Sequence, residues 1–277
     1  MIKVGFVTCV QLGYSCMEAI YEVGGKLDLA ISLLDNQAKS KSGRIYLDSF
    51  CNSKGIPLLK ASHVNNPEVI QSIKDAQLDW LFIIGWSQIA SQEVLEAPKR
   101  GVLGMHPTLL PTGRGRAAIP WAILKGLSKT GVTLFKLDSG VDTGPVVDQI
   151  EIALDNQVDA NILYQEVDAA HISLIKKVIP SLMADDLVLK EQDESLATEW
   201  PGRKPEDGLI DLTGSVFDAH RMVRALTRPY PGAFYFVDGI KVVVWKAVIS
   251  KSRLSDRTIN FYDGQLQILE YELINVK

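Results

Sequence analysis

The first part of the chain alternates between short apolar runs and segments with helical spacing. Apolar runs lie at Lys3–Cys9, Leu27–Leu34 and Trp80–Ile84. Gly24-Gly25 ends one helical segment and Asn66-Pro67 begins another, because glycine suits a helix end and an Asn cap followed by proline suits a helix start. Continuously apolar strands occur in parallel sheets that helices cover. We therefore expect an α/β fold: a Rossmann-like, mostly parallel sheet with helices on both faces.

The last part of the chain has a different pattern, in which strand-like runs are separated by turns. A helical segment at Val216–Leu226 precedes runs at Ala233–Val237 and Lys241–Ile249. Asp238-Gly239 and Asp263-Gly264 are hairpin signals. The edges of such a sheet could pair across a homodimer. We predict a catalytic domain over residues 1–185, a polar linker over 186–206 and a small β-rich C-terminal module over 207–277.

Charge and composition argue against several classes of protein. The net charge is -4 and the sequence pI is about 5.6, so no overall basic field would attract nucleic acid. Neither a membrane-spanning apolar run nor a signal peptide is apparent. Cys9, Cys16 and Cys51 lack the spacing of metal ligands. We expect reduced thiols, a cytoplasmic protein, and no metal, membrane or nucleic-acid partner.

Two loops carry the candidate chemistry. The first, Gly104–Arg116, follows a strand-like run and holds His106 next to Pro107, which fixes the local backbone. The second, Leu137–Pro145, holds Asp142 between glycines. An imidazole can exchange a proton near neutral pH, and a nearby carboxylate would orient it. The plain alternative is a capping aspartate in a turn and a histidine on an unrelated loop.

The two loops resemble the signature of formyltransferases that use N10-formyltetrahydrofolate. That family has Asn-x-His-Pro-Ser-Leu-Leu-Pro and then Asp-x-Gly-x-Asp-Thr-Gly-Pro, and Asp142 follows His106 by 36 residues, as in the family. Arg203–Ile210 and Arg228–Phe234 resemble the start of the family's C-terminal region. The resemblance implies His106 and Asp142 as catalytic residues and N10-formyltetrahydrofolate as co-substrate. It implies a folate pocket formed by Gly85, Trp86, Ser87, Gln88, Ile89, Leu137, Asp138, Gly140 and Val141.

One position departs from the family pattern. The family's asparagine, two residues before the histidine, is Gly104 here. The resemblance implies that this side chain holds the developing oxyanion, and such a donor is typically worth about 3–4 kcal/mol. Protonated His106, a water molecule or a backbone N–H could replace it. Otherwise the chain is a folate-binding protein that has lost turnover.

The resemblance implies a small set of formyl acceptors: initiator methionyl-tRNA, glycinamide ribonucleotide, water, and amino sugars linked to nucleotides. Residues 205–277 hold nine Lys/Arg and nine Asp/Glu, which gives tRNA phosphates little reason to bind. The loop from Arg114 to Trp121 is most similar to enzymes that formylate sugar nucleotides. We expect an N-formyltransferase that acts on a UDP- or dTDP-linked 4-amino-4,6-dideoxyhexose for a surface glycan such as a lipopolysaccharide O-antigen. A methionyl-tRNA formyltransferase is the alternative.

The sugar-nucleotide interpretation suggests substrate-binding residues. Arginine pairs with phosphate in bidentate fashion, which makes Arg114 and Arg116 candidates for the diphosphate. Ser42-Gly43-Arg44 is a weaker phosphate candidate. Two aromatic residues, Tyr230 and Phe234, are candidates to stack on the base, with the core of the small module as the alternative. Thr108 completes the predicted substrate set.

Overall fold

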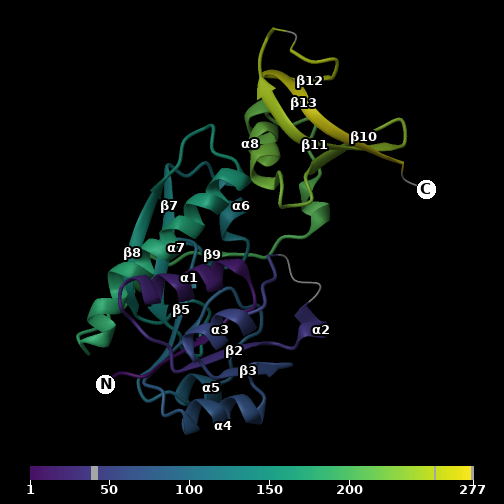
Figure 1. Ribbon diagram of the computed structural model, residues 1–277. Coiled ribbons are helices and arrows are strands. Elements are labelled where there is room, and N and C mark those ends of the chain that lie inside the picture. Colours follow the sequence, from purple (N-terminus) through teal and green to yellow (C-terminus); the bar gives the residue numbers. More distant parts are fainter. Residues whose placement is uncertain (39–42, 253, 276–277) are drawn as a thin grey trace. The chain divides into compact units, whose positions relative to one another are not determined.

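A seven-stranded sheet forms the centre of the N-terminal part of the protein in the computed structural model, which describes residues 1–38, 43–252 and 254–275 (Figure 1). The strand order is β3-β2-β1-β4-β5-β7-β8. The first five strands pair in parallel, and β5 pairs with β7 in antiparallel fashion. The expected mostly parallel α/β sheet is therefore confirmed. The strands are β1 Val4–Val7, β2 Leu29–Leu33, β3 Leu58–Ala61, β4 Trp80–Ile83, β5 Gly101–His106, β7 Lys129–Lys136 and β8 Val146–Ala153.

Helices bury both faces of this sheet, which explains why β1 and β2 are apolar at almost every position. Val69 and Ile73 of α4 (Pro67–Asp75) and Val94 of α5 (Gln92–Glu96) pack with the strands in one core cluster. The alternate strand residues point to the other face of the sheet, where the rings of Phe6 and Phe82 stack on each other. Helices α1 (Gln11–Glu22) and α7 (Ala160–Met183) lie together, joined by an ion pair between Glu22 and Lys176.

The first helix begins earlier than its apolar spacing indicates. The helical spacing of apolar residues begins at Tyr14, whereas α1 starts at Gln11. Gly13 makes this start possible, because a Cβ there would lie 2.0 Å from Thr8 Oγ1. The chain can therefore turn directly from β1 into the helix. The remaining helices of this part are α2 (Asp35–Ala38) and α3 (Asp48–Lys54).

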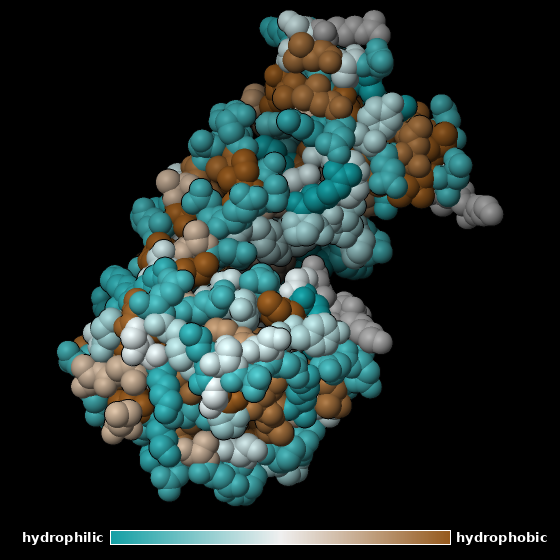
Figure 2. Space-filling model, in the orientation of Figure 1, coloured by the Kyte–Doolittle hydropathy of each residue, from teal (hydrophilic) through white to brown (hydrophobic). Residues whose placement is uncertain are grey.

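The C-terminal part contains a second sheet, with four antiparallel strands in the order β10-β11-β13-β12. Helix α8 (Val216–Leu226) packs on this sheet and against α6 (Ala118–Leu124). Both predicted hairpins are present, and this confirms the β-rich C-terminal module. Hydrophobic side chains are exposed over these strands (Figure 2). The strands are β10 Ala233–Val237, β11 Ile240–Ile249, β12 Thr258–Phe261 and β13 Gly264–Asn275.

By its contacts the chain divides into two units that the backbone enters more than once. The first unit comprises Met1–Arg114, Gly131–Glu151 and Asp168–Thr198. The second unit comprises Gly115–Thr130, Ile152–Val167 and Glu199–Lys277. The boundaries proposed along the chain, at residues 185 and 207, remain a prediction.

The polar segment between residues 186 and 206 has more structure than a linker requires. It contains the short 3-10 helix η1 (Glu194–Leu196) and strand β9 (Glu199–Trp200), which pairs with β6 (Arg114–Gly115). A second 3-10 helix, η2 (Pro205–Gly208), follows. No described helix is both long enough and apolar enough to cross a membrane.

Candidate functional site

The first unit brings His106 and Asp142 together. His106 is the last residue of β5, and its ring is almost buried. Its Nε2 lies 2.8 Å from the Gly113 carbonyl oxygen, and its Nδ1 lies 3.4 Å from Asp142 Oδ2. About a fifth of the Asp142 side chain is exposed, so solvent or a substrate can reach the pair from the carboxylate side.

The two neighbours of the ring determine where its protons can be. The Gly113 carbonyl can only accept, so Nε2 must carry a proton to bond to it. An ionised Asp142 also only accepts, so a hydrogen bond between these side chains requires a proton on Nδ1. The 3.4 Å separation is longer than a formed hydrogen bond, as catalytic contacts often are before substrate binds. The Nδ1 edge is therefore the place where His106 and Asp142 can share and pass a proton.

The loop that carries Asp142 has an unusual backbone. Asp142 has φ of 55°, in the left-handed region that few non-glycine residues adopt. Asp138 Oδ1 closes the loop by accepting hydrogen bonds from the Gly140 N–H and the Thr143 hydroxyl. At Gly144 a Cβ would lie 1.8 Å from the Lys136 carbonyl oxygen, so only glycine fits. The Asp and Gly residues of this segment therefore form the turn that presents Asp142.

Gln192, a residue outside this loop, holds the loop in place through hydrogen bonds. Its Nε2 donates to the carbonyls of Asp142 and Gly144, at 2.8 and 2.7 Å. Its Oε1 accepts from Arg114 Nε and Nη2. Arg114 in turn forms a two-pronged ion pair with Glu194, at 2.9 and 2.6 Å. A chain of side chains therefore links Glu194 through Arg114 and Gln192 to the backbone of Asp142.

Sequence reasoning missed Gln192 and Glu194, because both lie in the polar stretch interpreted as a linker. Arg114 was expected to bind substrate, and the structure places its buried guanidinium in this network, next to the largely exposed Glu194. The hydrogen bond from Glu194 raises the pKa of Arg114, and the same bond lowers the pKa of Glu194. A role for Arg114 in substrate binding remains a prediction, and its observed contacts position the Asp142 loop.

Leu137 occupies the space beside Gly104. A Cβ at Gly104 would lie 2.6 Å from Leu137 Cδ2 and 3.2 Å from its Cγ. The leucine therefore lies where an asparagine side chain would begin, and it packs against the core of the first unit. The leucine itself offers no hydrogen bond to a water molecule there. Of the three replacement donors considered from the sequence, it therefore favours protonated His106 and a backbone N–H over water.

The predicted folate segment follows β4 in the same unit. Gly85 has φ of 66°, and a Cβ there would lie 2.4 Å from Val10 Cγ2. The Gln88 amide ties this segment to the loop after β3, because it accepts from Val64 N–H and donates to the Ser62 carbonyl. Ser87 lies in the exposed part of the turn. Ile89 and Val141 are 80% and 60% exposed.

The other predicted substrate residues have different surroundings. Thr108 is buried in the first unit, and no described group bonds to its hydroxyl. Arg116, in the second unit, is exposed. The Tyr230 hydroxyl bonds to the hydroxyl of Tyr164 at 3.1 Å, and burial raises the pKa of Tyr230. The Phe234 ring is 7% exposed and stacks against neighbours of its own sheet. Their roles in substrate binding remain predictions.

Two further sequence candidates complete the description. Ser42 lies outside the described residues. Its neighbour Arg44 pairs with Asp35 at 3.4 Å and stacks on Tyr46. Within the described ranges, no group of three His, Cys, Asp or Glu side chains could hold a metal ion.

Replacing Gln192 with leucine tests its hold on the Asp142 loop. Gln192→Leu keeps the size of the side chain and removes two donors to the loop, so we expect kcat of the folded variant to fall at least about tenfold with a small change in KM. Amide hydrogen exchange at residues 142–144 should become faster. Gln71→Leu, on the exposed face of α4, is the matched control. Unchanged kcat and unchanged exchange in Gln192→Leu would contradict this role.

Comparisons with known proteins agree with the fold and with the family that the two loops resemble. Residues 33–179 match the model of the family described as Formyl transferase, and residues 203–277 match that of Formyl transferase, C-terminal domain. The Bifunctional polymyxin resistance protein ArnA of Wigglesworthia glossinidia brevipalpis is 27% identical over 240 residues, which is 87% of this chain and 37% of that protein. The chain therefore spans little more than a third of that relative's length.

Solved structures share the fold at low identity. The N-formyltransferase of Helicobacter canadensis, in complex with folinic acid and dTDP-3-aminofucose, has a TM-score of 0.71 at 18% identity, over 98% of this chain and 100% of that one. The methionyl-tRNA formyltransferase of Clostridium thermocellum has a TM-score of 0.64 at 18% identity, over 100% of both chains. Because the two family models together cover most of its length, the chain belongs to the formyl transferase family, as its two loop motifs predicted.

Proposed function

We propose that this formyltransferase moves a formyl group from N10-formyltetrahydrofolate to the amino group of a nucleotide-linked amino-deoxy sugar. The observation that carries the proposal is the His106–Asp142 pair, held in the first unit by β5 and by the Gln192-bound loop. The fold likeness to the Helicobacter canadensis protein, whose structure contains dTDP-3-aminofucose, supports a sugar acceptor. A UDP- or dTDP-linked 4-amino-4,6-dideoxyhexose, made for a surface glycan, is the finer form of the proposal.

In this proposal His106 and Asp142 handle the proton of the attacking amine. The Gly113 carbonyl fixes the ring through Nε2, so the Nδ1 edge and the Asp142 carboxylate face the reaction. Asp142 orients the ring, and the pair accepts the proton that the amine loses as its nitrogen bonds to the formyl carbon. The pair then returns a proton to N10 as the bond from the formyl carbon to N10 breaks and tetrahydrofolate leaves. A protonated His106 can also stabilise negative charge on the formyl oxygen.

The surroundings of the predicted folate segment suit a flat, partly apolar co-substrate. Trp86 Nε1 is buried, and no described group bonds to it. Ile89 and Val141 expose apolar side chains on the two loops that the family resemblance assigns to the folate pocket. Pterin-like rings offer both hydrogen-bond acceptors and apolar faces, so they could satisfy this set. N10-formyltetrahydrofolate would supply the activated formyl group.

Two other functions have specific support. The likeness to a methionyl-tRNA formyltransferase supports a tRNA acceptor. The equal numbers of basic and acidic residues in 205–277 argue against it, because phosphate-rich tRNA binds basic surfaces. The second alternative, a folate-binding protein without turnover, rests on Gly104 and on the leucine that packs against it.

A screen of acceptors tests the proposed function. With N10-formyltetrahydrofolate and a panel of UDP- and dTDP-amino sugars, we expect tetrahydrofolate release together with a sugar nucleotide that gains one formyl group. His106→Ala and Asp142→Asn should each lower kcat/KM by about 10²–10⁴-fold, as loss of a general acid–base does. Asp75→Asn, at the exposed end of α4, is the control. Formylation of methionyl-tRNA alone, or folate binding without turnover of any acceptor, would refute the proposal.

The space beside Gly104 allows a separate test of the oxyanion donor. Gly104→Asn must displace Leu137, which should destabilise the protein by about 1–3 kcal/mol, and Gly104→Asn/Leu137→Ala should recover most of that loss. We expect kcat of the double variant to stay near that of Leu137→Ala, because His106 or a backbone N–H already supplies the donor. A rise of about a hundredfold would instead mean that the natural site lacks one.

A homodimer and a cytoplasmic location belong to the same proposal. The three cysteines lie within the described residues and are buried thiols outside any disulfide bond, as suits a reducing compartment. Strand β13 pairs with β12 only at residues 264–267, so no described strand pairs with its later residues on that side. Leu269, Tyr271 and Leu273 are exposed there, and an unpaired apolar edge favours pairing with a second strand.

Sedimentation velocity tests this dimer. We expect the natural protein to sediment as a dimer at micromolar concentration. Leu273→Lys should sediment as a monomer, because a charge on the edge opposes strand pairing. Tyr262→Lys, in the turn between β12 and β13, should remain dimeric. A monomeric natural protein, or a dimeric Leu273→Lys, would refute pairing through this edge.

A further inference from the structure

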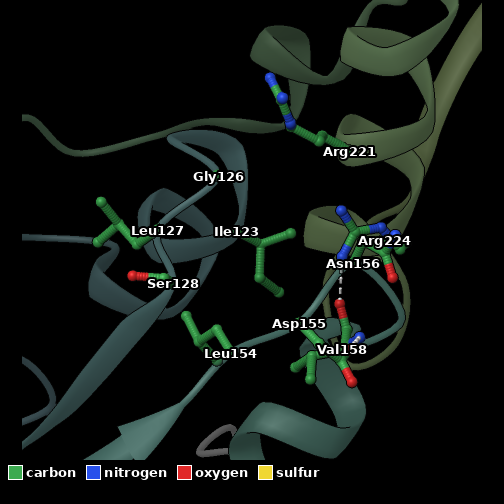
Figure 3. Close-up of a pocket in the computed structure, with 10 residues that line it drawn as sticks. All are labelled: Ile123, Gly126, Leu127, Ser128, Leu154, Asp155, Asn156, Val158, Arg221 and Arg224. Atoms are coloured by element: carbon green, nitrogen blue, oxygen red, sulfur yellow. Dashed lines mark hydrogen bonds between the residues drawn. The ribbon is translucent and has the colours of Figure 1, made fainter.

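The second unit contains a pocket that the formyl-transfer site does not use. It has a volume of about 280 Å³, and every residue that lines it belongs to the second unit, whereas His106 and Asp142 belong to the first (Figure 3). Ile123, Leu127 and Leu154 give it an apolar wall. Arg221 and Arg224 reach it from α8. Two cations next to an apolar wall are a combination that requires an explanation.

Arg224 is a half-buried cation. No described carboxylate forms an ion pair with it, although the charges of Asp155 and Asp159 act to raise its pKa. Its Nη1 donates to the Val158 carbonyl at 2.6 Å, drawn as a dashed line in Figure 3. Its Nε is buried, and no described group accepts a hydrogen bond from it. Burial, and next the charge of Arg221, lower the pKa of Arg224. A buried charge with an unused donor is costly, so this guanidinium is prepared for an acceptor that the described residues do not supply.

Arg221 adds a second charge from one turn earlier on α8. Its guanidinium packs against Gly126, where a Cβ would lie 3.3 Å from Nε and 3.4 Å from Cζ. Its carboxylate partner, Asp218, is largely exposed, and such pairs contribute little and yield readily to a better acceptor. The two arginines also line an adjoining pocket of about 370 Å³. The cationic surface is therefore continuous across both hollows.

The one carboxylate among the residues that line the first pocket, Asp155, already accepts hydrogen bonds from the backbone. Asp155 Oδ1 accepts from the backbone N–H groups of Gln157 and Val158, at 2.7 and 3.0 Å. It therefore holds the turn before α7, with an oxygen directed at backbone donors. Its charge and that of Asp159 also act on Arg224, but burial and Arg221 outweigh them, and two arginines face one carboxylate in the lining of this pocket. Ser128 and Asn156 add neutral polar groups at its rim.

We propose that this pocket binds the phosphate group of a small organic phosphate, with Arg221 and Arg224 as the residues that hold it. Arginine suits phosphate because its planar fork can donate two parallel hydrogen bonds to tetrahedral oxygens. The carbon skeleton would lie on the wall of Ile123, Leu127 and Leu154. Pockets for drug-sized ligands usually span about 300–1,000 Å³, so a hollow of 280 Å³ fits a phosphorylated compound smaller than a nucleotide.

The phosphates of a nucleic acid are the other source of the same chemistry. The concave shape and the apolar wall favour a small molecule, because binding of a duplex backbone depends on many separate contacts between basic residues and phosphates. The equal numbers of acidic and basic residues in 205–277 oppose a polyanion as well. The two sources predict different dependence on salt, so one titration series can distinguish them.

Titration of the full chain with glycerol 1-phosphate, at constant ionic strength, tests the proposal. We expect a dissociation constant of about 1 mM or below by calorimetry. The NMR signal of Arg224 Nε–H should shift on binding. Arg224→Gln and Arg221→Gln should each weaken binding by about tenfold or more, because each removes a charge-assisted hydrogen bond. Arg228→Gln, an exposed arginine of the same unit, should bind as the natural protein does.

Several results would overturn the proposal. These are equal affinity in all four proteins, absence of saturation at about twenty times the expected dissociation constant, and acetate bound as tightly as the phosphate. Tighter binding of a short RNA duplex, lost steeply with salt, would assign the arginines to nucleic acid instead. Circular dichroism establishes that each variant is folded. If Arg224→Gln does not fold, Arg221→Gln decides the question, because the Arg221 side chain is 40% exposed and, among the described residues, its hydrogen bond is to Asp218.

Discussion

The antiparallel pairing of β5 with β7 is the constraint on which the site depends. It places His106 opposite Thr133, whose buried hydroxyl donates to the Thr108 carbonyl and accepts from Leu110 N–H. Gln149 of β8 bonds to the same hydroxyl and to the Leu110 carbonyl. The loop after His106 is thus fixed to the sheet along its first residues and returns to place Gly113 against the imidazole. The strand pairing sets both the ring and the carbonyl that orients it.

The parts of the fold that could be predicted are those in which one force dominates. Buried parallel strands such as Trp80–Ile83 are apolar throughout, so their sequence alone indicates them. Strand β8 is half-exposed along most of its length and mixes polar with apolar residues, so no period identifies it. Gln192 was missed for a related reason. The nitrogen and the oxygen of its side-chain amide contact residues 50 and 78 positions away, which no local pattern records. The His106–Asp142 pair was found because the family's spacing encodes the long-range contact.

The residues at positions 104 and 137 constrain each other. Register places Gly104 next to Phe135 on the neighbouring strand, and two residues later Leu137 folds its side chain over the glycine. A side chain at 104 and a leucine at 137 therefore compete for one volume. The apolar Leu137 side chain therefore occupies the place where the family pattern has the side-chain amide of an asparagine. If the enzyme turns over, its oxyanion donor must come from a group that this exchange leaves intact, and the His106 ring is the nearest titratable candidate.

The charged groups around Asp142 are arranged about Arg114. Arg114 lies close enough to Asp138 and Asp142 for their charges to raise its pKa, after the larger effect of Glu194. Glu194 keeps the network from carrying an unbalanced positive charge. Gln192 accepts a hydrogen bond from the cation and donates one to the Asp142 carbonyl, so it connects Arg114 to the backbone of the loop. The arginine can thus help to position Asp142 through the backbone of its loop.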